Sequence, residues 1–261
     1  MAHIATQAIG SILDHYADVI EGGNAYNGGS EYHGIPGRYS RDPGLLSGDD
    51  SPLAAEGAGD ATTINVTGHS WPQSRWVRAD GAPYFLLCTA GTTAAIGEAR
   101  RITAWDNTAK NFTVDAFSAA PGSAGEFVVL EGFRRLPDTV DINADDTLSE
   151  GGYDRTFNLR LTPLKPRDQY GNGTETWDGI LTLTLRILKH NRLHEWQASA
   201  VENLTYLASI MTLGHNPDHR DGVYIRALLP IEDAPEIAHD DKTKIVAAAQ
   251  MPIVYRLQRG F

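Results

Sequence analysis

The sequence is poor in cysteine, in clustered basic residues and in long apolar segments. Its 261 residues include one cysteine, Cys88, in a short apolar run, which excludes an internal disulfide and predicts a small buried side chain. No apolar stretch approaches the roughly 20 residues of a membrane span. The first residues lack the basic and apolar regions of a secretory signal, so we expect synthesis and folding in a reducing cytoplasm.

Positive charge is also scarce. The chain has 22 Lys and Arg against 33 Asp and Glu, which gives a net charge of -11. A dedicated nucleic-acid binder carries a basic patch that neutralises phosphates, whereas the longest basic runs here are the pairs Arg100-Arg101 and Arg134-Arg135. The composition therefore argues against tight binding to DNA or to an anionic membrane.

Recognised catalytic motifs are missing. The chain has no Gly-x-Ser-x-Gly elbow, no Walker-type phosphate loop and no Gly-x-Gly-x-x-Gly fingerprint. His190 and His194 have helical ligand spacing but lack the glutamate that zinc peptidases use as a base. His215 and His219, with two neighbouring aspartates, could bring metal ligands together, although a polar loop explains the same residues. We expect no metal, no cofactor and no enzymatic activity.

Two weaker alternatives remain open. The polar segments 134–156 and 232–241 are rich in carboxylates, so composition alone does not exclude a glycosidase-like pair, although solvated loop charge is the simpler interpretation. Trp71 and Trp76 would stack on sugars if they were exposed, whereas tryptophans beside a strand usually belong to a core.

The N-terminal part of the chain predicts a helix followed by an irregular segment. Apolar residues at three- and four-residue spacing indicate an amphipathic helix over 4–20, which Gly22-Gly23 would end. The rest of segment 1–60 is a glycine-rich arm with neither helical nor strand period. Two interpretations stay open: a flexible surface loop, or an arm that becomes ordered against a neighbouring subunit.

The remainder predicts a small β domain and an α+β domain. Residues 61–133 contain short strands separated by turn signals, which favours a small all-β barrel or sandwich inserted between the first helix and its sheet. Residues 134–261 predict an antiparallel sheet with a long hairpin packed against helices. We therefore expect an α+β class with an additional all-β domain.

Several details of the α+β domain follow from pattern. We expect strands at 157–161, 180–188, 223–229 and 244–257, a helix at 194–211, a polar loop at 163–177 and an acidic loop at 232–241. Pro252 cannot donate to a ladder, so the last strand is expected to lie at an edge or to carry a bulge there.

The order of elements after Phe157 carries a family resemblance. A strand ending in Leu161-Thr162-Pro163 is followed by the loop with Lys165-Pro166-Arg167-Asp168, then a strand from Trp177, a helix from about His194 and the strand Ala247–Tyr255. This half of the chain, together with the N-terminal helix, resembles the tail terminator (tail-completion) proteins of long-tailed bacteriophages.

A second resemblance lies in the β segment. Gly97–Asp106 and Phe112–Pro121 look like a small β module of phage virion proteins. Tail terminators normally lack such a block, so its role stays open between decorating the outside of a ring and contacting the head-side connector.

The tail-terminator resemblance implies a structural, non-enzymatic protein. It would form a ring, as a homohexamer, at the head-proximal end of the tail, stop polymerisation of the tail tube and join the tube to the head connector. The implied location is the neck of the virion, after synthesis in the host bacterial cytoplasm, with no membrane partner. DNA would pass through the acidic lumen without specific binding. The candidate contacts with the tail tube or a neighbouring subunit are Lys165, Arg167, Asp168, Tyr170 and Trp177. The strand at 244–257 would pair or pack across subunits as an edge.

Two other hypotheses compete with this one. The protein could be a head–tail connector or stopper, with the β domain as its interacting unit. It could instead be a glycan-binding or hydrolytic protein, for which the loop with His215 and His219 would be the site of a metal-dependent reaction.

Overall fold

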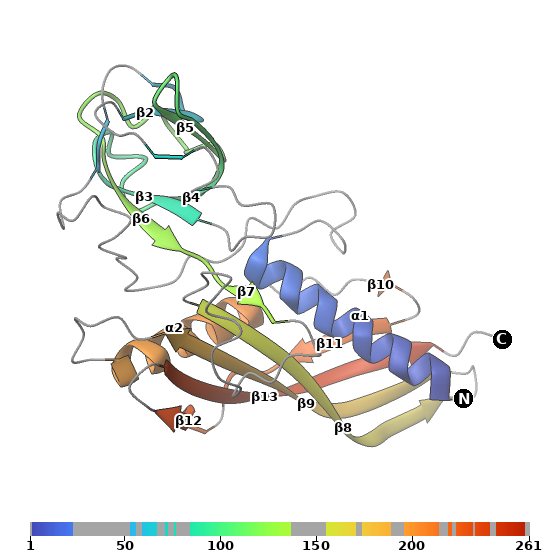
Figure 1. Ribbon diagram of the computed structural model, residues 1–261. Coiled ribbons are helices and arrows are strands. Elements are labelled where there is room, and N and C mark those ends of the chain that lie inside the picture. Colours follow the sequence, from blue (N-terminus) through green and yellow to red (C-terminus); the bar gives the residue numbers. More distant parts are fainter. Residues whose placement is uncertain are drawn as a thin grey trace. The chain divides into compact units, whose positions relative to one another are not determined.

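The computed structural model contains two compact units (Figure 1). It describes residues 2–22, 53–55, 59–66, 71–72, 76, 84–136, 155–170, 174–188, 196–213, 219–220, 223–231, 233–240 and 244–258. We call Met1–Tyr32 with Arg135–Phe261 the sheet–helix unit, and His33–Arg134 the small β unit. Most described elements are strands and two are helices, so the expected α+β class is confirmed, and strands make up the larger share. Most of the predicted glycine-rich arm and of the acidic connection lies outside the described residues.

A seven-stranded sheet forms the sheet–helix unit. Its strands are β7 (Arg134–Arg135), β8 (Arg155–Tyr170), β9 (Thr174–Leu188), β10 (His219–Arg220), β11 (Val223–Leu228), β12 (Glu236–Asp240) and β13 (Lys244–Gln258). The order is β10-β11-β13-β9-β8-β7, and β12 pairs with β13 on the side of β11. The strands β8 to β13 pair antiparallel, and β8 with β9 forms the long hairpin.

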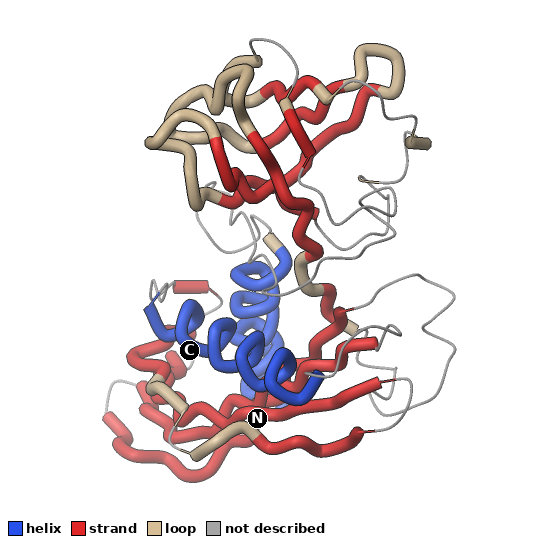
Figure 2. The backbone as a smooth tube through the Cα atoms, turned by 90° about the vertical axis from the view of Figure 1, so that its left-hand side faces the viewer, coloured by secondary structure: helices blue, strands red, loops and turns tan. Residues whose placement is uncertain are grey.

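Helices α1 (Ala2–Glu21) and α2 (Trp196–Leu213) lie on the same side of this sheet (Figure 2). Their buried apolar side chains include Ile12, Tyr16, Ile20, Leu204, Leu207 and Met211. Gly22 ends α1 with a positive φ of 86°, and its N–H donates to the Asp18 carbonyl at 2.8 Å. This is the left-handed cap that favours glycine, so the predicted helix and its C-cap are confirmed.

The central strands β9 and β13 supply the core of the sheet–helix unit. Alternate residues on one face pair directly and are all buried: Leu181 with Met251, Leu183 with Ala249, Leu185 with Ala247, and Ile187 with Ile245. Burial of one leucine side chain contributes about 1.5–3 kcal/mol, so this layer is a major source of stability. The two-residue alternation of the sequence predicted this face, because side chains of a strand alternate between its faces.

The segment 163–177, which the sequence predicts as a polar loop, is mostly strand. β8 continues to Tyr170 and β9 begins at Thr174. Prolines and charges suggested a loop, but the register shifts between Pro163 and Lys165 and between Pro166 and Asp168. Each bulge takes up an extra residue at a proline, so the strand continues where local propensity predicts a break.

Pro252 lies in the interior of the sheet, so the prediction of an edge or a bulge at this residue is wrong. β13 pairs with β9 without a register shift, and Pro252 is opposite Ile180. The opposite edge of β13 pairs with β12 before Pro252 and with β11 after it, so neither strand pairs with Pro252 itself. The Pro252 carbonyl accepts a bond from the Leu229 N–H at 2.8 Å. Since N–H and C=O of a strand residue point the same way, the missing donor costs no bond to β9.

The acidic loop predicted at 232–241 is partly wrong as well. Glu236–Asp240 forms β12, whose pairing with β13 joins Ile237 to Ala247 and Asp240 to Ile245. β12 carries little strand propensity of its own, so its pairing depends on the neighbouring long strand β13.

A six-stranded antiparallel sheet forms the small β unit. Its strands are β1 (Leu53–Ala54), β2 (Thr63–Asn65), β3 (Tyr84–Ala90), β4 (Ala99–Asp106), β5 (Asn111–Val114) and β6 (Glu126–Glu131). The order is β1-β6-β3-β4-β5-β2, and the sheet is visibly curled in Figure 1. The strands expected between 61 and 133 are present, and the sheet begins earlier than residue 61 because β1 pairs with β6.

Aromatic rings fill the interior of the small β unit. Trp71 packs edge-on against Trp76 and Trp105, with ring centroids 5.0 and 5.2 Å apart. The Trp105 indole N–H donates to the Trp71 carbonyl at 3.2 Å. Such edge-to-face pairs add about 0.5–1.5 kcal/mol beyond area burial, so the tryptophans stabilise the fold of this unit.

Candidate interaction site

The far end of β8 carries the residues that the sequence singled out as contacts. Lys165 and Arg167 are exposed there, together with the apolar Leu164, whose side chain is 56% exposed. The backbone of Asp168 and Tyr170 belongs to the same strand, but their side chains lie outside the described residues. The structure thus brings two predicted contact residues together on one sheet edge.

Trp177 differs from these residues because it lies on β9 and is half-buried. Its indole N–H donates to the Glu175 carboxylate at 3.3 Å, and Glu175 is itself buried. In the ladder, Trp177 is opposite Pro166 of β8 and Tyr255 of β13. Trp177 therefore lies beside Pro166 on the same face of the sheet and offers only part of its ring to a partner.

Two prolines shape this outer edge. Pro163 and Pro166 lack backbone N–H groups, and both lie at bulges in the pairing with β9. Proline and bulges on an edge strand oppose the addition of another strand. A partner at this edge would therefore be recognised by side chains rather than by a continued β ladder.

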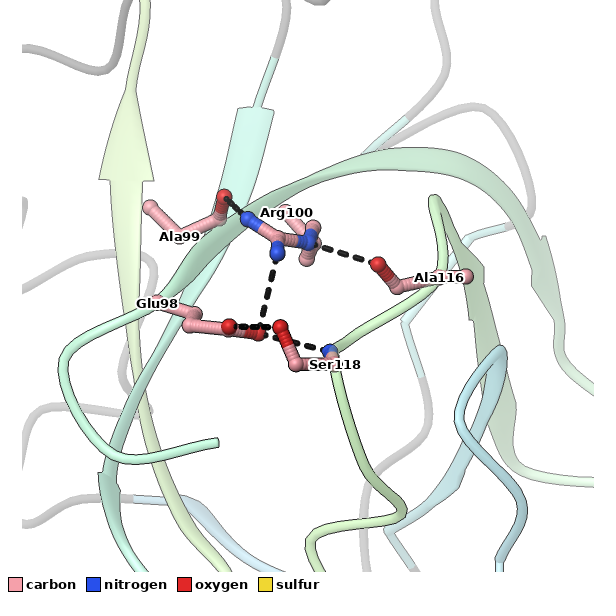
Figure 3. A network of polar contacts seen from close by, with 5 residues as sticks. All are labelled: Glu98, Ala99, Arg100, Ala116 and Ser118. Carbon is pink, nitrogen blue, oxygen red and sulfur yellow. Dashed lines mark hydrogen bonds and ion pairs between the residues drawn. The ribbon is translucent and has the colours of Figure 1, made fainter. Parts of the chain in front are cut away.

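Glu98, Arg100 and Ser118 form a polar network in the small β unit (Figure 3). The Glu98 carboxylate accepts bonds from the Ser118 N–H at 2.9 Å and from its hydroxyl, and lies 2.9 Å from the Arg100 guanidinium. Arg100 also donates to the carbonyls of Ala99 and Ala116.

The chemistry of this network is structural. The bonds from Ser118, with a smaller contribution from Arg100, lower the pKa of Glu98 below its usual value. The lowered pKa keeps the Glu98 carboxylate ionised at neutral pH, where it accepts both bonds from Ser118. The network therefore fixes the segment after β5 against the start of β4. No sequence motif predicts this network, because none marks a glutamate that bonds a serine 20 residues away.

The alternative sites find little support where the structure describes them. Trp71 and Trp76 are buried, with 5% and 1% exposure, so the sugar-stacking hypothesis for this pair is wrong. Cys88 is buried as expected, and desolvation raises the pKa of its thiol. His190, His194 and His215 lie outside the described residues, as does the His219 side chain. Within the described part of the chain, no group of three or more His, Cys, Asp or Glu could hold a metal ion.

Comparison of the chain with protein-family models, with curated protein sequences and with solved structures finds no significant match. The function of this chain is therefore inferred from its own residues and from the order of its elements. None of the helices among the described residues is long and apolar enough to cross a membrane.

Proposed function

We propose that this protein is a structural component of a phage virion, which forms a ring at the head-proximal end of the tail. The observation that carries the proposal is the order of elements in the sheet–helix unit. Helix α1, the long β8–β9 hairpin, helix α2, β11 and β13 follow one another along the chain, with both helices on one face. This is the arrangement that the resemblance to tail terminators implies.

In this role the exposed end of β8 contacts the tail tube or a neighbouring subunit. Lys165 and Arg167 supply charge, and Leu164 supplies apolar area beside them. Asp168 and Tyr170 on β8 and the half-buried Trp177 on β9 complete the proposed contact set. The net charge of -11 suits a lumen through which DNA slides without binding.

The small β unit is, in this proposal, a small barrel or sandwich of phage virion type. It decorates the outside of the ring or contacts the head connector, and the whole protein acts without catalysis or a cofactor. Its place is the neck of the virion, where its partners are further copies of itself (six in the ring that the resemblance implies), the tail tube protein and the connector or stopper.

A connector or stopper is the second candidate function. The division into two units favours it, because a separate β unit provides an independent contact module. Imaging of virions with a label on this protein distinguishes the two: a terminator lies at the top of the tube, and a stopper lies on the connector.

Mass in solution tests the proposed function most directly. Light scattering of the purified protein, alone and with tail tubes, is expected to give a closed oligomer or a capped tube. The double variant Lys165→Ala, Arg167→Ala is expected to weaken capping, and Arg226→Ala on β11, also exposed, is the matched control. A protein that stays monomeric alone and does not bind tubes contradicts the proposal.

A further inference from the structure

Two edges of the seven-stranded sheet carry charges of opposite sign. On β8, Arg160, Lys165 and Arg167 are exposed, and we call these residues the basic edge. On β12 and the turn before it, Asp233, Glu236 and Asp240 are exposed, and we call these the acidic edge. β8 and β12 lie on opposite sides of the central β9–β13 pair, so the two edges face away from each other.

Each edge has a polar neighbour on an adjacent element. At the basic edge, Asp178 on β9 is opposite Lys165 and is half-buried. At the acidic edge, the Asp240 carboxylate accepts a bond from the Gln197 side-chain amide at 2.6 Å, so Asp233 and Glu236 are the residues to vary there.

The backbone of both edges discourages a continued sheet. β8 has Pro163 and Pro166 at two bulges, and five-residue β12 has a register shift between Ile237 and His239. Short, bulged and charged edge strands are the features that oppose strand addition. Contact at either edge therefore depends on its side chains.

We propose that the basic edge of one copy binds the acidic edge of the next copy. This inference rests on the proposed ring-forming function and names its subunit interface. With a net charge of -11, whole copies repel one another, so the basic edge is a surface on which a second copy is attracted. Because the two surfaces differ, the contact is heterologous and repeats from copy to copy, and it closes into a ring if the rotation between copies permits.

The size of the effect follows from the exposure of these groups. An exposed ion pair changes an association constant by up to about fivefold, and three pairs act together. Reversing two charges replaces attraction by repulsion, so we expect self-association to weaken at least about tenfold. Salt is expected to weaken the wild-type association as well, because exposed charges are screened.

Charge reversal provides the test. The first variant reverses the basic edge (Lys165→Glu, Arg167→Glu), and the second reverses the acidic edge (Asp233→Lys, Glu236→Lys). The third carries all four changes. Arg160 and Asp240 remain unchanged, the latter because of its bond to Gln197. Sedimentation of the full-length chains gives the association constant, and circular dichroism checks that each variant folds.

The expected pattern is specific to complementary edges. Each single-edge variant loses association, while the four-residue variant regains it because both edges have exchanged sign. An equimolar mixture of the two single-edge variants also associates. The matched controls Arg226→Glu on β11 and Glu126→Lys on β6, both exposed, leave association unchanged.

Three outcomes overturn the inference. In the first, a wild type that associates is insensitive to either single-edge reversal, and the proposed function then stands without this interface. In the second, the four-residue variant remains as weak as the single-edge variants although it is folded. In the third, the basic-edge variant loses binding to tail tubes and retains self-association, which identifies the tube as the partner. A wild type that is monomeric both alone and with tubes contradicts the proposed function itself.

Discussion

Replacing Gly179 with alanine is expected to destabilise the sheet–helix unit, whereas the same change at Gly10 is expected to stabilise it. A Cβ added at Gly179 would lie 3.2 Å from Leu161 Cδ1, from the Thr162 carbonyl oxygen and from Tyr255 Cε1. Ordinary contacts between carbon atoms are about 3.5–4.0 Å, so these neighbours must move apart. The carbonyl belongs to the paired strand β8 and cannot shift alone.

The magnitude follows from two opposing effects. Overpacking of a filled core costs about 1–3 kcal/mol. Alanine also lowers the conformational entropy of the unfolded chain, which stabilises the folded state by about 0.4–1 kcal/mol. We therefore expect Gly179→Ala to lower the free energy of unfolding by about 0.5–2 kcal/mol. At Gly10, inside α1, an added Cβ meets nothing within 4 Å. Gly10→Ala is therefore expected to raise the free energy of unfolding by about 0.5–1 kcal/mol.

Urea unfolding followed by helical ellipticity measures both effects. Both described helices belong to the sheet–helix unit, so this signal reports on that unit. The two variants share their chemistry and differ in surroundings, which makes each the control for the other. Equal stabilisation of both variants would refute the close approach of Tyr255 and β8 to Gly179.

Three further substitutions test other parts of the structure. Leu183→Ala, at a fully buried position opposite Ala249, is expected to cost about 2–5 kcal/mol in urea unfolding, and a loss below 1 kcal/mol would contradict its place in the core. Burial raises the pKa of Tyr255 from 10.0 to about 12, so its contribution to stability is full below pH 10 and is lost as the pH rises toward 12. Tyr255→Phe should therefore lose less stability than wild type between pH 10 and 12 in alkaline unfolding. Hydrogen bonds from Ser118 lower the pKa of Glu98, so this group stabilises the small β unit above its usual pKa and loses the effect as the pH falls. In Glu98→Gln, the free energy of unfolding should fall less than in wild type as the pH is lowered. An unchanged dependence on acid pH would show that the network does not stabilise the folded state.

The sequence was sufficient where one periodic pattern controls a whole element. The three- and four-residue spacing around Ile12 and Tyr16 predicted α1, and the alternation from Leu181 to Ile187 predicted both β9 and its buried face. In these segments burial and local propensity favour the same structure, so the pattern alone identifies the element.

The errors arose where pairing with a distant strand overrides a local signal. Pro163 and Pro166 predict a loop, but bulges let β8 continue past them along β9. Pro252 predicts an edge, but the gap between β11 and β12 accommodates it inside the sheet. A proline is tolerated or excluded according to the direction of its missing N–H, which depends on the finished sheet.

The candidate site was predicted in part. Exposure of Lys165 was expected from a polar segment, and the structure places it on a strand instead of a loop. The acidic edge was assigned to a loop, because Glu236 and Asp240 carry no strand signal. That the basic and acidic edges lie on opposite sides of the sheet follows only from the strand order, which no local sequence pattern predicts.

The sheet–helix unit is built from two segments of the chain, with the small β unit between them, and this order determines when its parts can fold during synthesis. Helix α1 is translated before the small β unit, yet it packs on β8 and β11, and its Asp14 forms an ion pair with Arg135 at 2.6 Å. These partners all follow the small β unit in the chain. At roughly 5–20 residues per second, α1 waits on the order of 10–50 s for β13 to complete the sheet. The small β unit, finished by Arg134, can fold on the ribosome in the meantime. Because β8, β12 and β13 follow the small β unit in the chain, the exposed charges of β8 and β12 are assembled into one sheet only after that unit has been translated.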